Sequence, residues 1–267
     1  MYRLATFEHE NHSLLVQAIH SKNVYVFSYL TQFLEKSKKL ESVDLYYLLS
    51  IAFDVCTSTS HHRIPSIIIE CMIKTEKINE YIDIIHERMF EIKNIELIKF
   101  LMNTSYFNPN FVCSDENDAF YKIVDIKNEE LVQLMFNRFS CNINSYDKDG
   151  VMLVVRSVEN DAPHISSLFI QRKCELHGKN EDGKSLLELC IEKKWYLHVT
   201  YILGNGYRVL YDDENYFHRM CHLAVISNST LIFDRLIKNF YASRIQRFWK
   251  SWMAFKSSKF IHHPPGS

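Results

Sequence analysis

The sequence contains little glycine and proline, with six glycines and five prolines in 267 residues. Tight turns depend on these two residue types, so the shortage disfavours an all-β fold and favours helices joined by short loops. All six glycines lie at or after Gly150. Turns in the first half of the chain must therefore use other residues, such as Asn117, wherever the backbone needs a positive φ.

Long apolar runs are also missing. No run approaches the roughly 18 residues that a membrane span needs, and the opening segment MYRLATFEHENHS carries acids and no apolar secretory core. We therefore expect an intracellular protein, cytoplasmic or nuclear, without integral membrane association. The 47% of hydrophobic and 24% of charged residues are typical of a folded soluble protein.

Paired cysteines and catalytic motifs are absent as well. The seven cysteines are odd in number and include no C-x-x-C pair, so we interpret them as core residues and expect neither a disulfide framework nor a cysteine zinc site. There is no P-loop, nucleophile elbow, G-x-G-x-x-G or H-E-x-x-H motif. Carboxylate pairs such as Asp212 and Asp213 are expected on surface turns, where solvated charges are ordinary. We expect no enzymatic activity, no cofactor and no bound metal.

What the sequence does contain is a repeat. Between Cys141 and Cys190 one pattern occurs twice: Asp149-Gly150 and Asp182-Gly183 lie 33 residues apart, and an apolar run follows each. Repeats with such a period indicate stacked units, each of which buries its apolar face against a neighbour. Function is then expected on the surface of a stack.

The same spacing predicts seven units along the chain. Their centres lie 33 or 34 residues apart except for one step of 38, where the polar segment DVCTSTSHHR is expected to lengthen a turn. In each unit, a first short helix precedes a second helix with apolar residues three and four apart. The predicted centres are Ala18, Ala52, Phe90, Val124, Ser157, Cys190 and Ala224.

These features resemble the ankyrin-repeat family. The segments NINSYDKDG (142–150) and LHGKNEDGKS (176–185) look like the loop that enters each ankyrin repeat, and His222-Leu223-Ala224 stands where the family has the H-x-A of its T-P-L-H-x-A signature. The resemblance implies an all-α, ankyrin-type helical solenoid of antiparallel helix pairs with short loops over residues 1–240. Tetratricopeptide and HEAT repeats are the alternative solenoids, but neither supplies the recurring Asp-Gly turn.

His218 and His222 are four residues apart with Cys221 between them. This spacing could place two metal ligands on one helical face. The favoured interpretation follows from the ankyrin resemblance: His222 bonds the loop backbone as the family's structural histidine, and His218 is exposed.

The end of the chain differs in charge from the rest. Residues 241–267 hold five Lys or Arg and no Asp or Glu, against 26 basic and 32 acidic residues before them. We expect a basic amphipathic helix at 241–260 and an unstructured tail at 261–267. Its apolar face comprises Ile245, Phe248, Trp249, Trp252, Met253 and Phe255, and its basic residues are Arg244, Arg247, Lys250 and Lys256.

Part of this helix resembles the IQ motif, although Ser251 stands where the motif prefers Gly and Phe255 where it prefers a second basic residue. The resemblance implies docking into calmodulin or a light-chain-like protein through Ile245, Gln246, Trp249, Lys250, Trp252 and Phe255. One alternative is a capping helix whose Trp249 and Trp252 cover the apolar end of the seventh unit. Contact with a membrane surface or with nucleic acid is the weakest alternative.

Two functions follow. The first is a non-enzymatic protein–protein interaction module that binds through the loop tips and the exposed positions of the first helices: Tyr146, Asp147, Lys148, Arg156, Asn180, Glu181, Glu188, Asp212 and Asp213. The second is an adaptor or regulated subunit whose basic helix recruits calmodulin or another helix-binding protein.

The degenerate repeats are rich in Ile, Lys, Asn, Phe and Tyr, which indicates an AT-rich genome. Ankyrin proteins of this character are common in large DNA viruses and intracellular parasites. In such a virus or parasite, the resemblance would imply that the protein binds and diverts a host factor.

Overall fold

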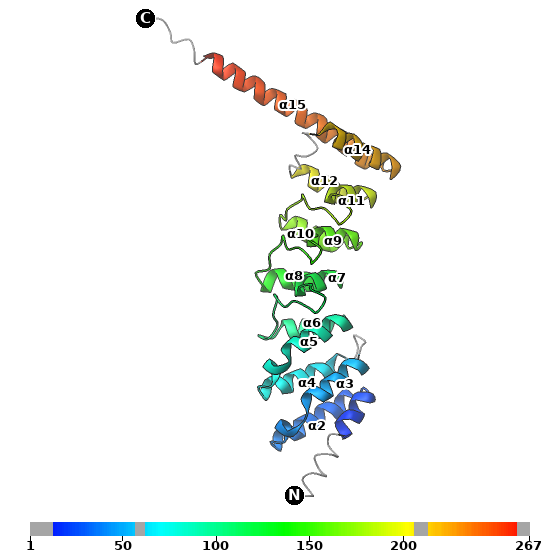
Figure 1. Ribbon diagram of the computed structural model, residues 1–267, viewed down its shortest axis with the longest axis vertical. Helices are drawn as coiled ribbons and strands as arrows, with labels where there is room; N and C mark the ends of the chain where they lie inside the picture. Colours follow the sequence, from blue (N-terminus) through cyan, green and yellow to red (C-terminus); the bar gives the residue numbers. More distant parts are fainter. Residues whose placement is uncertain (1–12, 57–61, 206–212, 261–267) are drawn as a thin grey trace, which may run out of the picture. The chain divides into compact units, whose positions relative to one another are not determined.

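The computed structural model describes residues 13–56, 62–205 and 213–260, with side chains as far as Met253. Every named element within these residues is a helix (Figure 1). The all-α, ankyrin-type solenoid predicted from the sequence is confirmed by the succession of helix pairs and hairpin turns set out below. The chain divides into two compact units, Met1–Cys141 and Asn142–Ser267.

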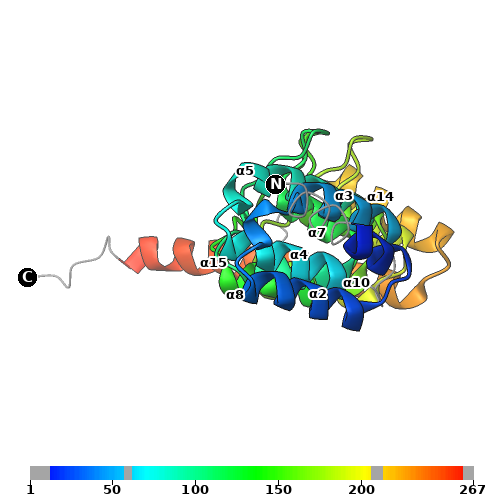
Figure 2. The same cartoon turned by 90° about the horizontal axis from the view of Figure 1, so that it is seen from below.

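The first unit is built from four successive helix pairs in its described residues. Second helices of neighbouring pairs contact one another, α2 with α4, α4 with α6 and α6 with α8. Viewed along the stack, α2 and α4 lie on one side, and α3 and α5 lie on the other (Figure 2). The pairs are residues 13–20 with α2 (Val24–Lys36), α3 (Leu45–Val55) with α4 (Arg63–Lys74), α5 (Ile78–Ile92) with α6 (Ile95–Met102), and α7 (Ala119–Asp125) with α8 (Glu129–Arg138); the short 3-10 helix η1 (Leu40–Ser42) precedes α3.

The second unit contains three pairs in the part that the structure describes. The first helices α9, α11 and α14 contact in succession, and α12 contacts α15. The pairs are α9 (Leu153–Glu159) with α10 (Pro163–Gln171), α11 (Leu186–Glu192) with α12 (Tyr196–Gly204), and α14 (Glu214–Ile226) with α15 (Thr230–Phe260).

Local sequence signals set the helix ends. Side-chain oxygens cap many N-termini by accepting a backbone N–H three residues ahead, as Asn94 does from Leu97 at 3.2 Å. Several first helices are followed by a residue in the left-handed conformation, which stops the helix and turns the chain towards its partner helix. These residues are Lys22, Lys93, Lys127, Asp161, Lys194 and Asn228.

The core includes the seven residues that the sequence analysis names as unit centres. Each predicted centre lies in the first helix of its pair and is buried: Ala18, Ala52, Phe90, Val124, Ser157, Cys190 and Ala224. Within each unit, small or apolar side chains at these points let first helices approach closely, as α3 does to α5 and α11 does to α9 and α14. Ser157 satisfies its buried hydroxyl by donating to the Val154 carbonyl at 2.6 Å.

A hairpin turn enters three of the pairs. Isolated antiparallel bridges join Val112 to Asp118, Tyr146 to Met152 and Lys179 to Ser185, so the turn recurs in one register. At its tip, Glu116, Gly150 and Gly183 have φ values of 66°, 74° and 76°. The two glycines therefore have the predicted conformation.

Asn117 was expected to supply the positive φ of the glycine-free turn, and this is wrong. Glu116 lies 34 residues before Gly150 and takes the left-handed conformation in its place. Asn117 is the next residue and is buried, with its side-chain amide directed to the Asp115 carboxylate at 3.3 Å.

The predicted boundary between residues 240 and 241 does not coincide with a break in the chain, since α15 is continuous from Thr230 to Phe260. Its first part packs in the seventh pair, where Ile232, Leu236 and Phe240 are buried. The predicted tail at 261–267 lies outside the described residues.

Candidate protein-binding surfaces

Asp147, predicted as a loop-tip contact, lies inside its turn. Its side chain is fully buried, and its Oδ1 accepts the backbone N–H groups of Asp149 and Val151 at 3.0 and 2.9 Å. A carboxylate with these partners rigidifies the hairpin and is not accessible to another protein. The expectation that Asp147 is exposed is therefore wrong.

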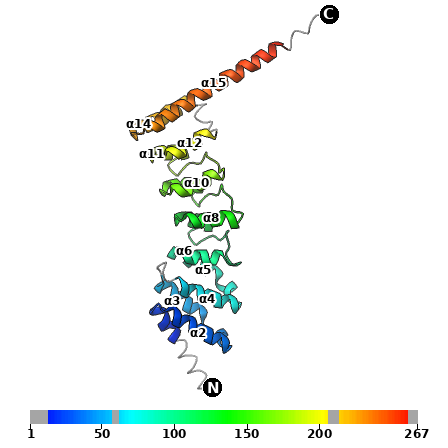
Figure 3. The ribbon, with the colours of Figure 1, turned by 180° about the vertical axis from the view of Figure 1, so that it is seen from behind.

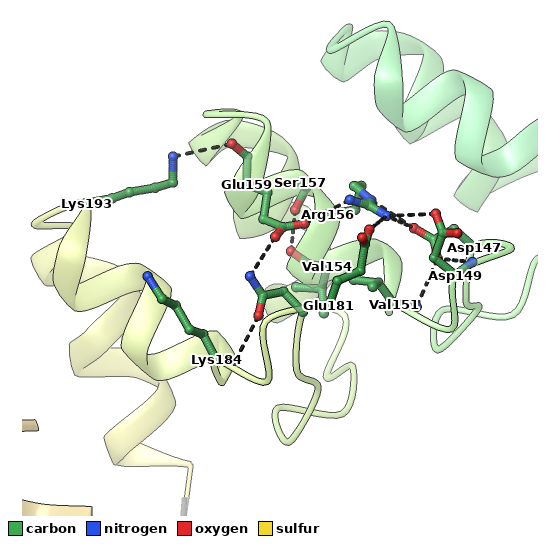
Figure 4. A network of polar contacts seen from close by, with 11 residues as sticks. Asp147, Asp149, Val151, Val154, Arg156, Ser157, Glu159, Glu181, Lys184 and Lys193 are labelled. Atoms are coloured by element: carbon green, nitrogen blue, oxygen red, sulfur yellow. Dashed lines mark hydrogen bonds and ion pairs between the residues drawn. The ribbon is translucent and has the colours of Figure 1, made fainter. Parts of the chain in front are cut away.

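Arg156 was also expected to be exposed, and it too is enclosed. Its guanidinium forms ion pairs with Asp147 at 2.6 Å, Glu159 at 3.1 Å and Glu181 at 3.0 Å, and only 16% of the side chain is exposed (Figure 4). Burial alone would lower the pKa of Arg156, but the carboxylates around it, beginning with Asp147, raise it above its ordinary value. Arg156 thus fastens its own hairpin to the next one through Glu181.

The second hairpin uses an amide where the first uses a carboxylate. Asn180 accepts the backbone N–H of Lys184 at 2.8 Å and donates to Glu159 at 2.9 Å. Glu188, expected on an exposed face of a first helix, is buried: it forms a capping box with Ser185 and an ion pair with Arg219. Asn180 is half-buried. Through these contacts, the side chains of Asn180 and Glu188 both hold the stack together.

Other predicted contacts do lie on the surface. Tyr146 is 53% exposed, and Lys148 in the same hairpin and Glu181 in the next hairpin are also exposed. Asp213 is exposed and caps α14 by accepting the N–H of Tyr216 at 3.0 Å. Asp212 lies outside the described residues.

The C-terminal helix changes character after Phe240. The ring of Phe240 stacks on Phe217 of α14 with centroids 3.8 Å apart, and Asn239 donates to the Leu203 carbonyl at 3.3 Å. Arg244 forms an ion pair with Glu214 and lies over the Phe240 ring at 4.8 Å. These contacts anchor α15 to its neighbouring helices as far as Arg244.

Beyond Arg244 the described side chains of α15 are exposed. Figures 1 and 3 show the helix continuing past the end of α14. Gln246 and Lys250 are also exposed, and the side chain of Phe255 lies outside the described residues. The exposed apolar residues are Ile245 at 59%, Phe248 at 70%, Trp249 at 56%, Trp252 at 42% and Met253 at 57%.

The capping interpretation of this segment is contradicted by these exposures. Trp249 and Trp252 contact each other edge-to-face, with centroids 5.4 Å apart, instead of covering the seventh pair. Since α15 continues as one helix past this point, it carries both indoles away from α14 along the helix axis.

The predicted role of His222 is wrong as well, since both His218 and His222 are exposed on α14. The loop-binding histidine is His86 of α5, which is fully buried. Its Nδ1 lies 2.7 Å from the Ile82 carbonyl and its Nε2 3.0 Å from the Asn108 N–H, which fixes the neutral form protonated at Nδ1. Burial lowers the pKa of His86 below its ordinary 6.5.

Among the described residues, no group of three His, Cys, Asp or Glu could hold a metal ion.

The first unit has a further surface that the sequence analysis did not predict. A groove of about 780 Å³ runs between α2 and α6, with α4 as its floor. Tyr25 and Tyr29 line it and are 90% and 70% exposed. The signal was present as large apolar residues on α2 outside its buried stripe of Phe27, Thr31 and Leu34.

Comparisons with known proteins add a likeness in fold. No protein-family model matches the chain, and no curated protein matches it in sequence. Among solved structures, the chain is similar to the crystal structure of the ankyrin repeat domain of Bcl-3, described there as a unique member of the IkappaB protein family; the match covers 72% of this chain and 86% of that chain, with 15% identity and a TM-score of 0.49. At that identity and score the likeness carries no functional argument, and the ankyrin-like fold rests on the chain's own helix pairs and hairpins. No described helix has the length and apolar character needed to cross a bilayer.

Proposed function

We propose that the protein is a non-enzymatic adaptor: a helical stack that carries an exposed basic helix, residues 245–253 of α15, for docking into the groove of an acidic partner protein. One observation carries this proposal. Five large apolar side chains are exposed together on one short stretch of described helix. Monomeric proteins seldom expose so many large apolar groups together unless another molecule covers them.

The charge of the helix selects the partner. Arg247 and Lys250 flank the apolar residues, and the sequence from 241 onward contains no acid. A basic amphipathic helix favours an apolar groove with an acidic rim, because rim charges speed encounter and orient the helix. Calmodulin and light-chain-like proteins have this chemistry, as the resemblance to the IQ motif implies.

The indoles should contribute most to the binding free energy. Tryptophan buries a large apolar area with few rotatable bonds and is over-represented among residues that dominate interfaces. We expect Trp249→Ala or Trp252→Ala to weaken binding by about tenfold or more, and Gln246→Ala to weaken it less.

Fluorescence titration tests the proposal. Residues 240–260, which contain Trp249 and Trp252 but not Trp195, are titrated with calmodulin with and without calcium. We expect a blue shift of the tryptophan emission at micromolar concentrations, because docking removes the indoles from water. A matched peptide with Trp249→Ala and Trp252→Ala, followed by anisotropy of an attached dye, serves as control. An unshifted emission in both calcium states would exclude a calmodulin-type partner.

The loop tips support a second candidate surface, an interaction module on the stack itself. Tyr146 is exposed at the bridge of its hairpin with Met152, Lys148 is exposed in the same hairpin, and Glu181 is exposed in the next hairpin. Charge reversal at Lys148 and Glu181 is expected to weaken capture of a partner purified with the full chain. Capture unchanged by both reversals would remove this face. That the partner is a host factor in the cytoplasm or nucleus stays a prediction from composition and from the resemblance.

A further inference from the structure

The groove between α2 and α6 has the form of an unfilled helix position. Three parallel second helices contribute one stripe each, with Tyr25 and Tyr29 on one wall, Ile67 on the floor and Phe100 on the opposite wall. The stripe on α2 spans residues 24–32, about two turns. All lining residues named here are helical or cap a helix, so their backbone groups are used internally and a strand has no edge to join.

The floor of the groove carries two opposite charges that have no ion-pair partner among the described residues. Arg63 begins α4 and Glu70 follows seven residues later, so the charges lie about 10 Å apart along the helix. By contrast, Lys99 on the wall is engaged with Glu96 and Glu130 at 3.1 and 2.5 Å. Arg63 adds positive charge to the positive end of the α4 dipole, which favours an incoming acid there.

We propose that this groove binds an amphipathic helix of a partner protein, with apolar residues on Tyr25, Tyr29 and Phe100, an acid facing Arg63 and a base facing Glu70 two turns away. Charge complementarity specifies this occupant. The exposed segment of α15 from a second copy fits it poorly, since residues 241–267 contain no acid to meet Arg63. The groove is thus a second docking surface, independent of the helix at 245–253.

A display library provides the probe. Helix-forming peptides of about 16 residues, varied on one face among Leu, Ile, Phe, Glu and Lys, are selected against the full chain. We expect selected peptides to carry an acid and a base seven residues apart and to bind Tyr25→Ala/Tyr29→Ala at least about tenfold more weakly. Both tyrosines are exposed, so the melting temperature of this variant should stay unchanged. Tyr146→Ala, which removes an exposed tyrosine outside the groove, is the matched control.

Charge exchange makes the test specific. Arg63→Glu/Glu70→Arg should reverse preference between a selected peptide and its charge-exchanged counterpart, whereas Lys36→Glu, on α2 outside the groove, should not. The proposal is overturned if no peptide is selected, if binding ignores the tyrosines, or if both charge versions bind both proteins alike. Self-association of the chain lost with Tyr25→Ala/Tyr29→Ala would also overturn it, by assigning the groove to a second copy.

Discussion

At the scale of residues, one turn position shows how the repeat is specified. Glu116, Gly150 and Gly183 occupy equivalent tips with positive φ, a conformation that glycine adopts freely and other residues adopt at a cost of about 1 kcal/mol or more. The repeat thus keeps its backbone geometry even where its glycine is missing.

Substituting valine for Gly150 or Gly183 isolates this conformational cost. No atom lies within 4 Å of an added Cβ at either position, so no clash contributes. We expect each change to lower the free energy of unfolding by about 1–3 kcal/mol, measured by urea denaturation. Glu116→Gly should raise it by a smaller amount. Equal stability of all variants and the parent chain would contradict the register of the hairpins.

Histidine protonation should make stability depend on pH. Burial of the ring holds the pKa of His86 below its ordinary 6.5. At a pH between these two pKa values, the ring is protonated in the unfolded chain and neutral in the folded protein. The free energy of unfolding should therefore fall as the pH drops below about 6.5, and it should stop falling once the pH is below the lowered pKa of the folded protein. A protonated Nε2 could no longer accept the Asn108 N–H. His86→Gln should reduce this slope in a pH series of thermal melts, leaving the part that comes from His198, whose pKa burial also lowers. Exposed His164→Gln should leave the slope in place.

At the scale of elements, α15 is one helix with two roles. Its first part is a structural member of the last pair, and the part beyond Arg244 presents apolar side chains to solvent. Sequence periodicity predicts both parts equally well, because a stripe of apolar residues looks the same whether it faces a core or awaits a partner.

Paired alanine substitutions distinguish the two parts of α15. Phe240 is buried against Phe217, so Phe240→Ala should lower the free energy of unfolding by about 3–5 kcal/mol. Trp249→Ala, two turns later on an exposed face, should change it by less than about 0.5 kcal/mol. Denaturant midpoints measure both. A large loss of stability from Trp249→Ala would show that the indole is buried in the folded protein and would remove the docking helix.

The sequence predicted the period and the buried centres because close packing of first helices demands a small or apolar side chain at one fixed point, as at Ala52 and Cys190. Surface roles were harder to predict. Arg156 and Glu188 have the polarity of surface residues, and only the fold shows that each is enclosed by partners from its own and the next pair. The groove at Tyr25 was missed because it needs three helices that are distant in sequence.

At the scale of the whole molecule, the described residues offer chemistry for binding and a scaffold to present it. The buried Asp147 and the half-buried Arg156 form contacts within the protein, and Arg156 joins its own hairpin to the next one through Glu181. The exposed features of the described residues include the basic helix of α15, the hairpin that carries Tyr146 and a charged groove across α4. A chain with separate docking surfaces can bring two partners together, which is what the adaptor proposal requires.

Amide hydrogen exchange of the full chain, with and without calmodulin, tests the docking of α15 most directly. In the complex we expect exchange to slow over residues 245–253, because a helix held in a groove opens less often. Residues 230–240, already packed in the seventh pair, should change little, and Trp249→Ala/Trp252→Ala should abolish the effect. Exchange over 245–253 that is the same with and without calmodulin, in both calcium states, would contradict a calmodulin-type partner for this helix.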